Sequence, residues 1–358
     1  MLQFELAQKP ALPRVPRPIV LIGTGGIARD AHLPAYRKAG FPVAGLYDLN
    51  LDRARSVARQ FSVEPVFPSL EATVAGAPDH AVFDIAIPAA GLLAVLPHLP
   101  DGRAVLIQKP LGENLDQARQ ILNLCTRKRL RAAVNFQLRY APYVLAARSL
   151  IEQGAIGELH DMEVRASVHT PWELWTFLQS IPRAEINYHS IHYLDLLRSF
   201  LGEPRGVYAK TLKHPLSPQL ASARSIIILD YGDTLRACIS TNHGHAFGRR
   251  HQESFIKWEG TRGAIIAKMG LLMNYPAGES DDMEVCILGK SDRPQWESVR
   301  IDGSWFPDAF IGTMASVMRW AEDPEDTAAT SVDDAIKTMA LAETAYQSSA
   351  RGGEPVVY

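Results

Sequence analysis

The chain has 358 residues, of which 47% are hydrophobic and 21% charged. This composition is that of a soluble globular protein, and the length exceeds what one hydrophobic core usually serves, so we expect two domains. A formal net charge of -2 gives no electrostatic basis for binding nucleic acid or an anionic membrane. Three widely separated cysteines, no spanning apolar run and no signal-peptide pattern predict a cytoplasmic protein with reduced thiols and no metal site.

The first predicted element is the strand 19–22, which runs directly into a Gly-x-Gly-x-x-Ala turn. In this turn Gly23 permits a tight bend, Gly25 lets the backbone approach a pyrophosphate, and Ala28 packs the following helix against the strand. Asp48 follows the next strand, at the spacing of an acid that binds a ribose hydroxyl. The pattern predicts a dinucleotide site made by Gly23, Thr24, Gly25, Gly26, Ile27, Ala28 and Asp48.

Up to residue 136 short apolar strands alternate with helices, which predicts a doubly wound parallel sheet of the Rossmann type. After the strand 19–22 and its helix, the expected strands are 43–47, a short one near 66, 81–87, 104–107 and 131–135. The other expected helices are 51–61, 69–75, 89–97 and 114–128. We therefore assign residues 1–136 to an NAD(P)-binding domain.

Beyond residue 136 the pattern changes to successive strands, which predicts an α+β domain over 137–358 around a large, mostly antiparallel, open-faced sheet. The expected strands are 161–168, 207–212, 222–231, 234–242, 253–259, 263–268 and 284–288. The expected helices are 142–153, 188–201, 307–322 and 331–350, the last of which could pack back on the first domain.

Two stretches carry candidate catalytic residues. Lys109 follows the strand 104–107, and ligands of open α/β sheets bind beyond the carboxyl ends of the strands, so a nicotinamide would lie beside it. The alternative is an ordinary surface lysine in a loop.

The second stretch is a predicted helix on which Tyr188, His192 and Asp195 share one face. Oxidation of an alcohol needs a base for the hydroxyl proton, and the pKa of histidine suits that role near neutral pH. Two alternatives stay open: His189 and His192 could hold a metal, or both could be hydrogen-bonded in a domain interface.

Together these residues resemble the Gfo/Idh/MocA family, which includes glucose-fructose oxidoreductase and inositol dehydrogenase. The resemblance runs almost from end to end, and its motifs occur in the family's order. They are the turn 23–28, Asp48, Pro88, Lys109-Pro110, Arg139 with Pro142, Gly154-Ala155-Ile156-Gly157, His192 with Asp195, and Ser331 to Ala335.

The resemblance implies an NAD(P)-dependent oxidoreductase acting on a secondary alcohol of a sugar, polyol or cyclitol. It implies cofactor contacts from Pro88 and Gln108, contact of Lys109 with both nicotinamide and the reacting oxygen, and His192 as acid/base. It also implies a homodimer or homotetramer formed through the open sheet. Asp48 favours NAD because a carboxylate repels a 2′-phosphate, although Arg53 could reach round and accept NADP.

Two departures from the family pattern matter. Its usual Glu-Lys-Pro reads Gln108-Lys109-Pro110, and Tyr188 replaces the acid that commonly stands four residues before the histidine. Losing two carboxylates removes charges that would keep Lys109 cationic and support a protonated His192. Our hypothesis is that Tyr188 shares the proton transfer, with its phenolate stabilised by Lys109 and with His189 or His192 as relay.

An aromatic loop is the candidate substrate wall. The rings of Trp172 and Trp175 suit the C–H faces of a sugar, although such a cluster is often simply core. Arg183 could bind the carboxylate of an aldonate or uronate, or could be an ordinary surface arginine. His243 and His245 are expected near a sheet end rather than on a metal.

Three other functions share the same resemblance. They are a cofactor-retaining redox glycosidase, a reductase of a non-sugar carbonyl or dihydrodiol, and a non-catalytic dinucleotide sensor that regulates a partner protein. The missing acids favour the sensor, whereas Lys109 and His192 favour an enzyme.

Overall fold

The structure is a computed structural model that describes residues 4–289 and 292–357. The chain forms two compact units. The parallel-sheet unit comprises Lys9–Tyr140 and Phe306–Met339, and the mixed-sheet unit comprises the residues up to Gln8, Ala141–Trp305 and those from Ala340 onward. No helix in the described ranges is long and apolar enough to cross a membrane.

The parallel-sheet unit is built on five parallel strands in the order β2-β1-β3-β4-β5. They are β1 Ile19–Ile22, β2 Val43–Tyr47, β3 Val82–Ile85, β4 Ala104–Ile107 and β5 Arg131–Val134. Every residue of β1, β3 and β4 is buried, as expected of a sheet covered on both faces. The order reverses between β1 and β3, and in such sheets ligands bind outside the carboxyl ends of the strands at this point. The strand expected near residue 66 is only an isolated bridge between Leu46 and Val66.

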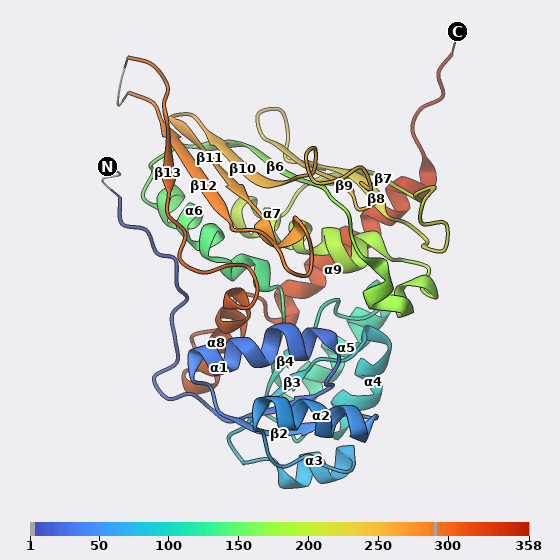
Figure 1. Ribbon diagram of the computed structural model, residues 1–358. Helices are drawn as coiled ribbons and strands as arrows, with labels where there is room; N and C mark the ends of the chain where they lie inside the picture. The colour runs from blue at the N-terminus through green and yellow to red at the C-terminus, as the bar shows by residue number, and fades with distance from the viewer. Residues whose placement is uncertain (1–3, 290–291, 358) are drawn as a thin grey trace. The chain divides into compact units, whose positions relative to one another are not determined.

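Helices flank these strands in the parallel-sheet unit (Figure 1). They are the π turn η1 Ala28–His32, α1 Leu33–Ala39, α2 Leu51–Phe61, α3 Leu70–Gly76, α5 Leu115–Arg127, the 3-10 turn η4 Gln137–Tyr140 and α8 Asp308–Glu322. Side chains of Asn50, Ser69 and Asn114 cap α2, α3 and α5 by accepting a backbone N–H.

One predicted helix of this unit is interrupted. The stretch 89–97 consists of three short pieces, η2 Ala89–Gly91, α4 Leu92–Val95 and η3 Leu96–His98. Pro97 lacks the N–H that a continuing α-helix would use, so the ladder of hydrogen bonds ends there.

The mixed-sheet unit is built on eight strands in the order β13-β12-β11-β10-β6-β9-β8-β7, in which only the β6–β9 pair is parallel among the described residues. The strands are β6 Leu159–Ser167, β7 Gly206–Leu212, β8 Arg224–Asp230, β9 Arg236–Asn242, β10 Glu253–Gly260, β11 Gly263–Lys268, β12 Asp282–Ile287 and β13 Trp296–Val299. β13 was not expected, because four residues with one buried side chain give no alternating apolar pattern. The predicted fold class is confirmed.

One face of this sheet carries the helices α6 Pro142–Glu152 and α7 Ile191–Leu201 (Figure 1). The remaining helical segments of the unit are η5 Trp172–Gln179, η6 Ile186–Ser190, η7 Gly270–Leu272 and the part of α9 Val332–Arg351 from Ala340 onward. Side chains alternate along β8, so Ile227 is buried while Ile226 and Ile228 are exposed on the other face.

Candidate functional site

The glycine turn after β1 has the geometry that its sequence requires. Gly23 has φ +97°, and a Cβ there would lie 2.5 Å from the carbonyl oxygen of Ala86, so only glycine fits. A Cβ at Gly25 would meet no atom within 4 Å, so the turn faces open space at that point. Ala28 is fully buried where the helix packs against the sheet. These features fit a cofactor whose pyrophosphate lies over the turn.

Asp48 lies at the end of β2 with its carboxylate held by protein donors. Oδ2 accepts from the backbone N–H and hydroxyl of Thr24 at 2.7 and 2.9 Å, and Oδ1 accepts from the N–H of Asn50 at 2.8 Å. Arg53 on α2 donates to both oxygens, with Nη2 2.7 Å from Oδ1. Burial opposes ionisation, but these hydrogen bonds outweigh it and hold the pKa of Asp48 below its ordinary value.

Gln108 and Lys109 follow β4. The Gln108 carbonyl oxygen accepts from the amide of Asn135 at 2.9 Å and lies 3.2 Å from Nε2 of His32. Burial lowers the pKa of Lys109 to about 8. Gln108 thus contributes no negative charge beside a lysine that burial already makes easier to deprotonate.

A buried acid that sequence reasoning missed is linked to Gln108 through His32. Asp84, in the middle of β3, accepts from the Tyr36 hydroxyl at 2.6 Å and lies 2.7 Å from Nδ1 of His32, and all three residues are fully buried. A charged residue inside the apolar strand Val82–Ile85 was the sequence signal for this pair.

The candidate helix begins earlier than expected and with a different geometry. Tyr188 lies within the π turn η6, whereas His192 lies in the first turn of α7, so the α-helical spacing that would align them does not apply there. The Tyr188 ring meets Phe177 edge-on at 5.5 Å between centroids. The His192 ring meets Trp305 at 5.9 Å, and His192 is buried.

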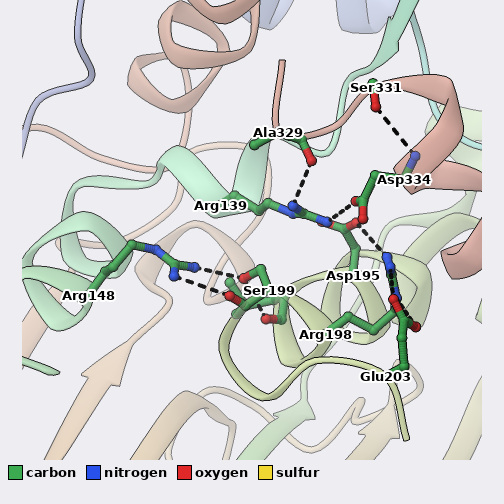
Figure 2. A network of polar contacts seen from close by, with 10 residues as sticks. Arg139, Arg148, Asp195, Arg198, Ser199, Glu203, Ala329, Ser331 and Asp334 are labelled. Atoms are coloured by element: carbon green, nitrogen blue, oxygen red, sulfur yellow. Dashed lines mark hydrogen bonds and ion pairs between the residues drawn. The ribbon is translucent and has the colours of Figure 1, made fainter. Parts of the chain in front are cut away.

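Two charged residues of the family motifs are held within their own units, as Figure 2 shows. In the mixed-sheet unit Asp195 lies 4.0 Å from the guanidinium of Arg198, which also donates to Glu203. In the parallel-sheet unit Arg139 donates to Asp334 at 2.7 Å.

Glu185, just before η6, is a functional candidate that sequence reasoning missed. Its carboxylate is fully buried and accepts from the hydroxyls of Ser190 at 2.7 Å, Thr241 at 3.0 Å and Ser225. Nε2 of His243 lies 3.4 Å from it. Burial would raise the pKa of Glu185, but His243 and the hydroxyl donors hold it below its ordinary value.

The His243 ring packs against the candidate helix. Its centroid is 4.3 Å from that of His189, and Trp172 meets His189 and His243 at 5.1 and 5.6 Å. Trp172 is therefore part of a small buried cluster, whereas Trp175 is partly buried against Tyr275 at 5.2 Å.

The Arg183 guanidinium is engaged by the chain's own carboxylate. It donates to both oxygens of Glu343, at 2.5 and 3.1 Å. Its role toward a substrate stays a prediction. Among the described residues no group of three or more His, Cys, Asp or Glu side chains is arranged to hold a metal ion.

The parallel sheet, its glycine turn and Asp48 together define a dinucleotide-binding protein of the Rossmann class. Residues 17–136 match the family model described as "Oxidoreductase family, NAD-binding Rossmann fold", and residues 144–266 match the "GFO/IDH/MocA C-terminal domain". The chain belongs to the Gfo/Idh/MocA family of oxidoreductases, which confirms the resemblance seen in its motifs.

Similar proteins of known name extend over most of the chain. It is 25% identical to D-apiose dehydrogenase of Rhizobium rhizogenes over 344 residues, which is 93% of this chain and 95% of that protein. It is 27% identical to inositol 2-dehydrogenase of Gluconacetobacter diazotrophicus over 219 residues, 57% of this chain and 62% of that one. The structure of levoglucosan dehydrogenase in complex with NADH and levoglucosan has a TM-score of 0.77 at 20% identity. The match covers 94% of this chain and 98% of that one, and it supports the fold.

Proposed function

We propose that this protein is an NAD(P)-dependent dehydrogenase that oxidises, reversibly, a secondary alcohol of a sugar, polyol or cyclitol. The observation that carries the proposal is the turn from Gly23 to Ala28, which faces open space at Gly25 and is followed by an ionised Asp48, in an oxidoreductase of this family. Nearly the whole chain also aligns with a relative named D-apiose dehydrogenase.

The parallel-sheet unit would hold the dinucleotide. The glycine turn would bind the pyrophosphate with its backbone N–H groups, Asp48 would accept from the ribose, and Pro88, Gln108 and Lys109 would line the nicotinamide end. When bound, the nicotinamide supplies the acceptor for the hydride of the alcohol carbon. We propose NAD as the favoured form, because the ionised Asp48 opposes a 2′-phosphate.

Three candidate side chains would handle the hydroxyl group and its proton. His192 would accept it, Tyr188 would share its transfer, and Lys109 would hold the reacting oxygen with its ammonium. His189, Trp172, Trp175 and Arg183 would contribute to substrate binding. With a pKa of about 8, the Lys109 side chain is mostly in its ammonium form at neutral pH.

The protein would act as a cytoplasmic homodimer or homotetramer. The outward face of β7 and β8 exposes Tyr208, Ile226 and Ile228 by 64%, 58% and 44%. We call these three residues the β7–β8 patch. A second copy of the sheet would cover these apolar side chains. The described cysteines are free thiols, as suits a reducing compartment.

The test is a fluorescence titration with NADH and NADPH, followed by a sugar, polyol and cyclitol panel read as NADH absorbance. We expect saturable binding, tighter for NADH, and turnover with at least one panel class. Product without net NADH would indicate the redox glycosidase, and turnover only with a carbonyl or dihydrodiol would indicate that reductase. Binding without any turnover would indicate the sensor, and no binding by a folded, nucleotide-free protein rejects the proposal.

A further inference from the structure

Glu185 is a buried charge to which the proposed proton chemistry assigns no role. Its side chain has no exposure to solvent, and an ionised carboxylate in such a place must be hydrogen-bonded and paired with a cation. Ser190, Ser225 and Thr241 supply hydroxyl donors, and the pKa of Glu185 lies below its ordinary value. The carboxylate is therefore ionised at neutral pH.

His243 is positioned to supply the compensating positive charge. Its Nε2 lies 3.4 Å from Oε1 of Glu185, and its Nδ1 lies 2.9 Å from the hydroxyl of Thr170. A hydroxyl oxygen can accept an N–H, so both ring nitrogens of His243 can carry a proton at once. A proton on Nε2 would then face the carboxylate of Glu185.

A charge on His243 acts directly on the candidate helix, because the rings of His243 and His189 are 4.3 Å apart. Two adjacent imidazolium rings repel each other, so a proton held on His243 disfavours a second proton on His189. We propose that Glu185 and His243 form a positioning pair that keeps His189 neutral, and so able to accept a proton, near neutral pH. This inference rests on the proposed dehydrogenase function, in which His189 relays the hydroxyl proton.

The Glu185 carboxylate acts through His243, which follows β9 in the chain.

Other titratable groups surround the pair. Tyr193 on α7 and Tyr346 on α9 are influenced by the charge of Glu185. The guanidinium of Arg183 lies over the ring of Tyr346, and His245 follows His243 by two residues. Burial and the Glu185 charge raise the pKa of both tyrosines, so they remain neutral. Arg183 and Glu343 neutralise each other. His192, on α7, is a further titratable ring, so its NMR signal must be assigned separately from that of His189.

The direct test follows the imidazole signals of the full chain by NMR as the pH is varied. Substitutions of His189, His192 and His243 by Asn assign the three rings. In Glu185→Gln we expect the midpoint of the His189 titration to rise by about one pH unit, because His243 no longer holds its proton. His243→Asn should raise it in the same direction, which keeps the test available if Glu185→Gln does not fold.

His245→Asn is the matched control, since this histidine is two residues from His243 and its ring lies against Phe247. It should leave the His189 midpoint in place. A His189 midpoint that stays unchanged in both Glu185→Gln and His243→Asn overturns the inference.

Kinetics give a second readout. In Glu185→Gln the acidic limb of kcat/KM should move up by about one pH unit, with the rate recovered at higher pH. A merely structural role would lower the rate at every pH and leave the limb in place. Absence of NADH binding and turnover in the unaltered protein rejects the proposed function, whereas normal turnover with an unmoved limb rejects the positioning pair alone.

Discussion

Arg53 controls how Asp48 can meet a ribose. The Arg53 side chain is 51% exposed, and its guanidinium must move away from Asp48 before a ribose hydroxyl can donate to that carboxylate. The same guanidinium can instead turn toward a 2′-phosphate. Arg53→Ala should tighten NADH binding by up to about fivefold and weaken NADPH binding by about tenfold or more. Arg55→Ala, which removes an exposed arginine of the same helix, is the control for the fluorescence titration. Equal changes in both affinities would contradict this assignment.

Tyr188 tests whether a phenol takes part in proton transfer. Tyr188→Phe removes only the hydroxyl and keeps the ring that packs on Phe177. We expect kcat to fall by about 10-fold to 100-fold at neutral pH, because general acid–base groups contribute on that scale. KM should change little. Unchanged turnover with undiminished substrate affinity would exclude the phenol from the chemistry.

Lys109 sets an expectation for the alkaline side of the pH profile. Because burial lowers its pKa to about 8, its ammonium is present below that pH and is lost above it. A reaction that needs the ammonium should therefore slow as pH rises through about 8. Lys109→Arg stays charged to above pH ~12, so its remaining activity should lack this limb in a kcat/KM profile. Persistence of the limb would assign it to another group.

At the scale of elements, the Asp84 network ties β3 to η1 and α1 and, through Gln108 and Asn135, to the ends of β4 and β5. Asp84→Asn replaces a fully buried acceptor and leaves the polar groups of Tyr36 and His32 poorly paired, which should cost about 2 kcal/mol of unfolding free energy. Urea denaturation measures it. Asp79→Asn, at an exposed carboxylate 3.5 Å from Arg103, should change stability by less than about 1 kcal/mol. If both substitutions lower the free energy of unfolding by similar amounts, the Asp84 network makes no special contribution to stability.

At the scale of the whole molecule, the β7–β8 patch predicts self-association. Ile228→Lys places a charge among its apolar side chains and should convert the oligomer to monomer, because a buried unpaired charge is strongly unfavourable at an interface. Light scattering after size exclusion measures the mass. Leu216→Lys, at an exposed leucine outside the patch, should leave the mass unchanged. A monomeric unaltered protein would refute the prediction.

The local features of this protein were readable from its sequence. The glycine turn and the alternation of strands and helices depend on residues close in the chain, and so did the motifs that carry the family resemblance. The predicted helix at 188–201 was real, but its first turn is a π turn, which a pattern of 3.6-residue period does not reveal.

The sequence by itself determined the fold class, the dinucleotide motif and the two family acids that this chain lacks. Only the tertiary structure decided which groups surround the candidate residues. Glu185 reaches His243 because η6 packs against the ends of β8 and β9, and Asp84 reaches His32 because β3 lies beside β1. Contacts between residues far apart in the chain leave no local pattern, since each partner taken alone is an ordinary acid or histidine, and burial is what gives the pair its electrostatic effect.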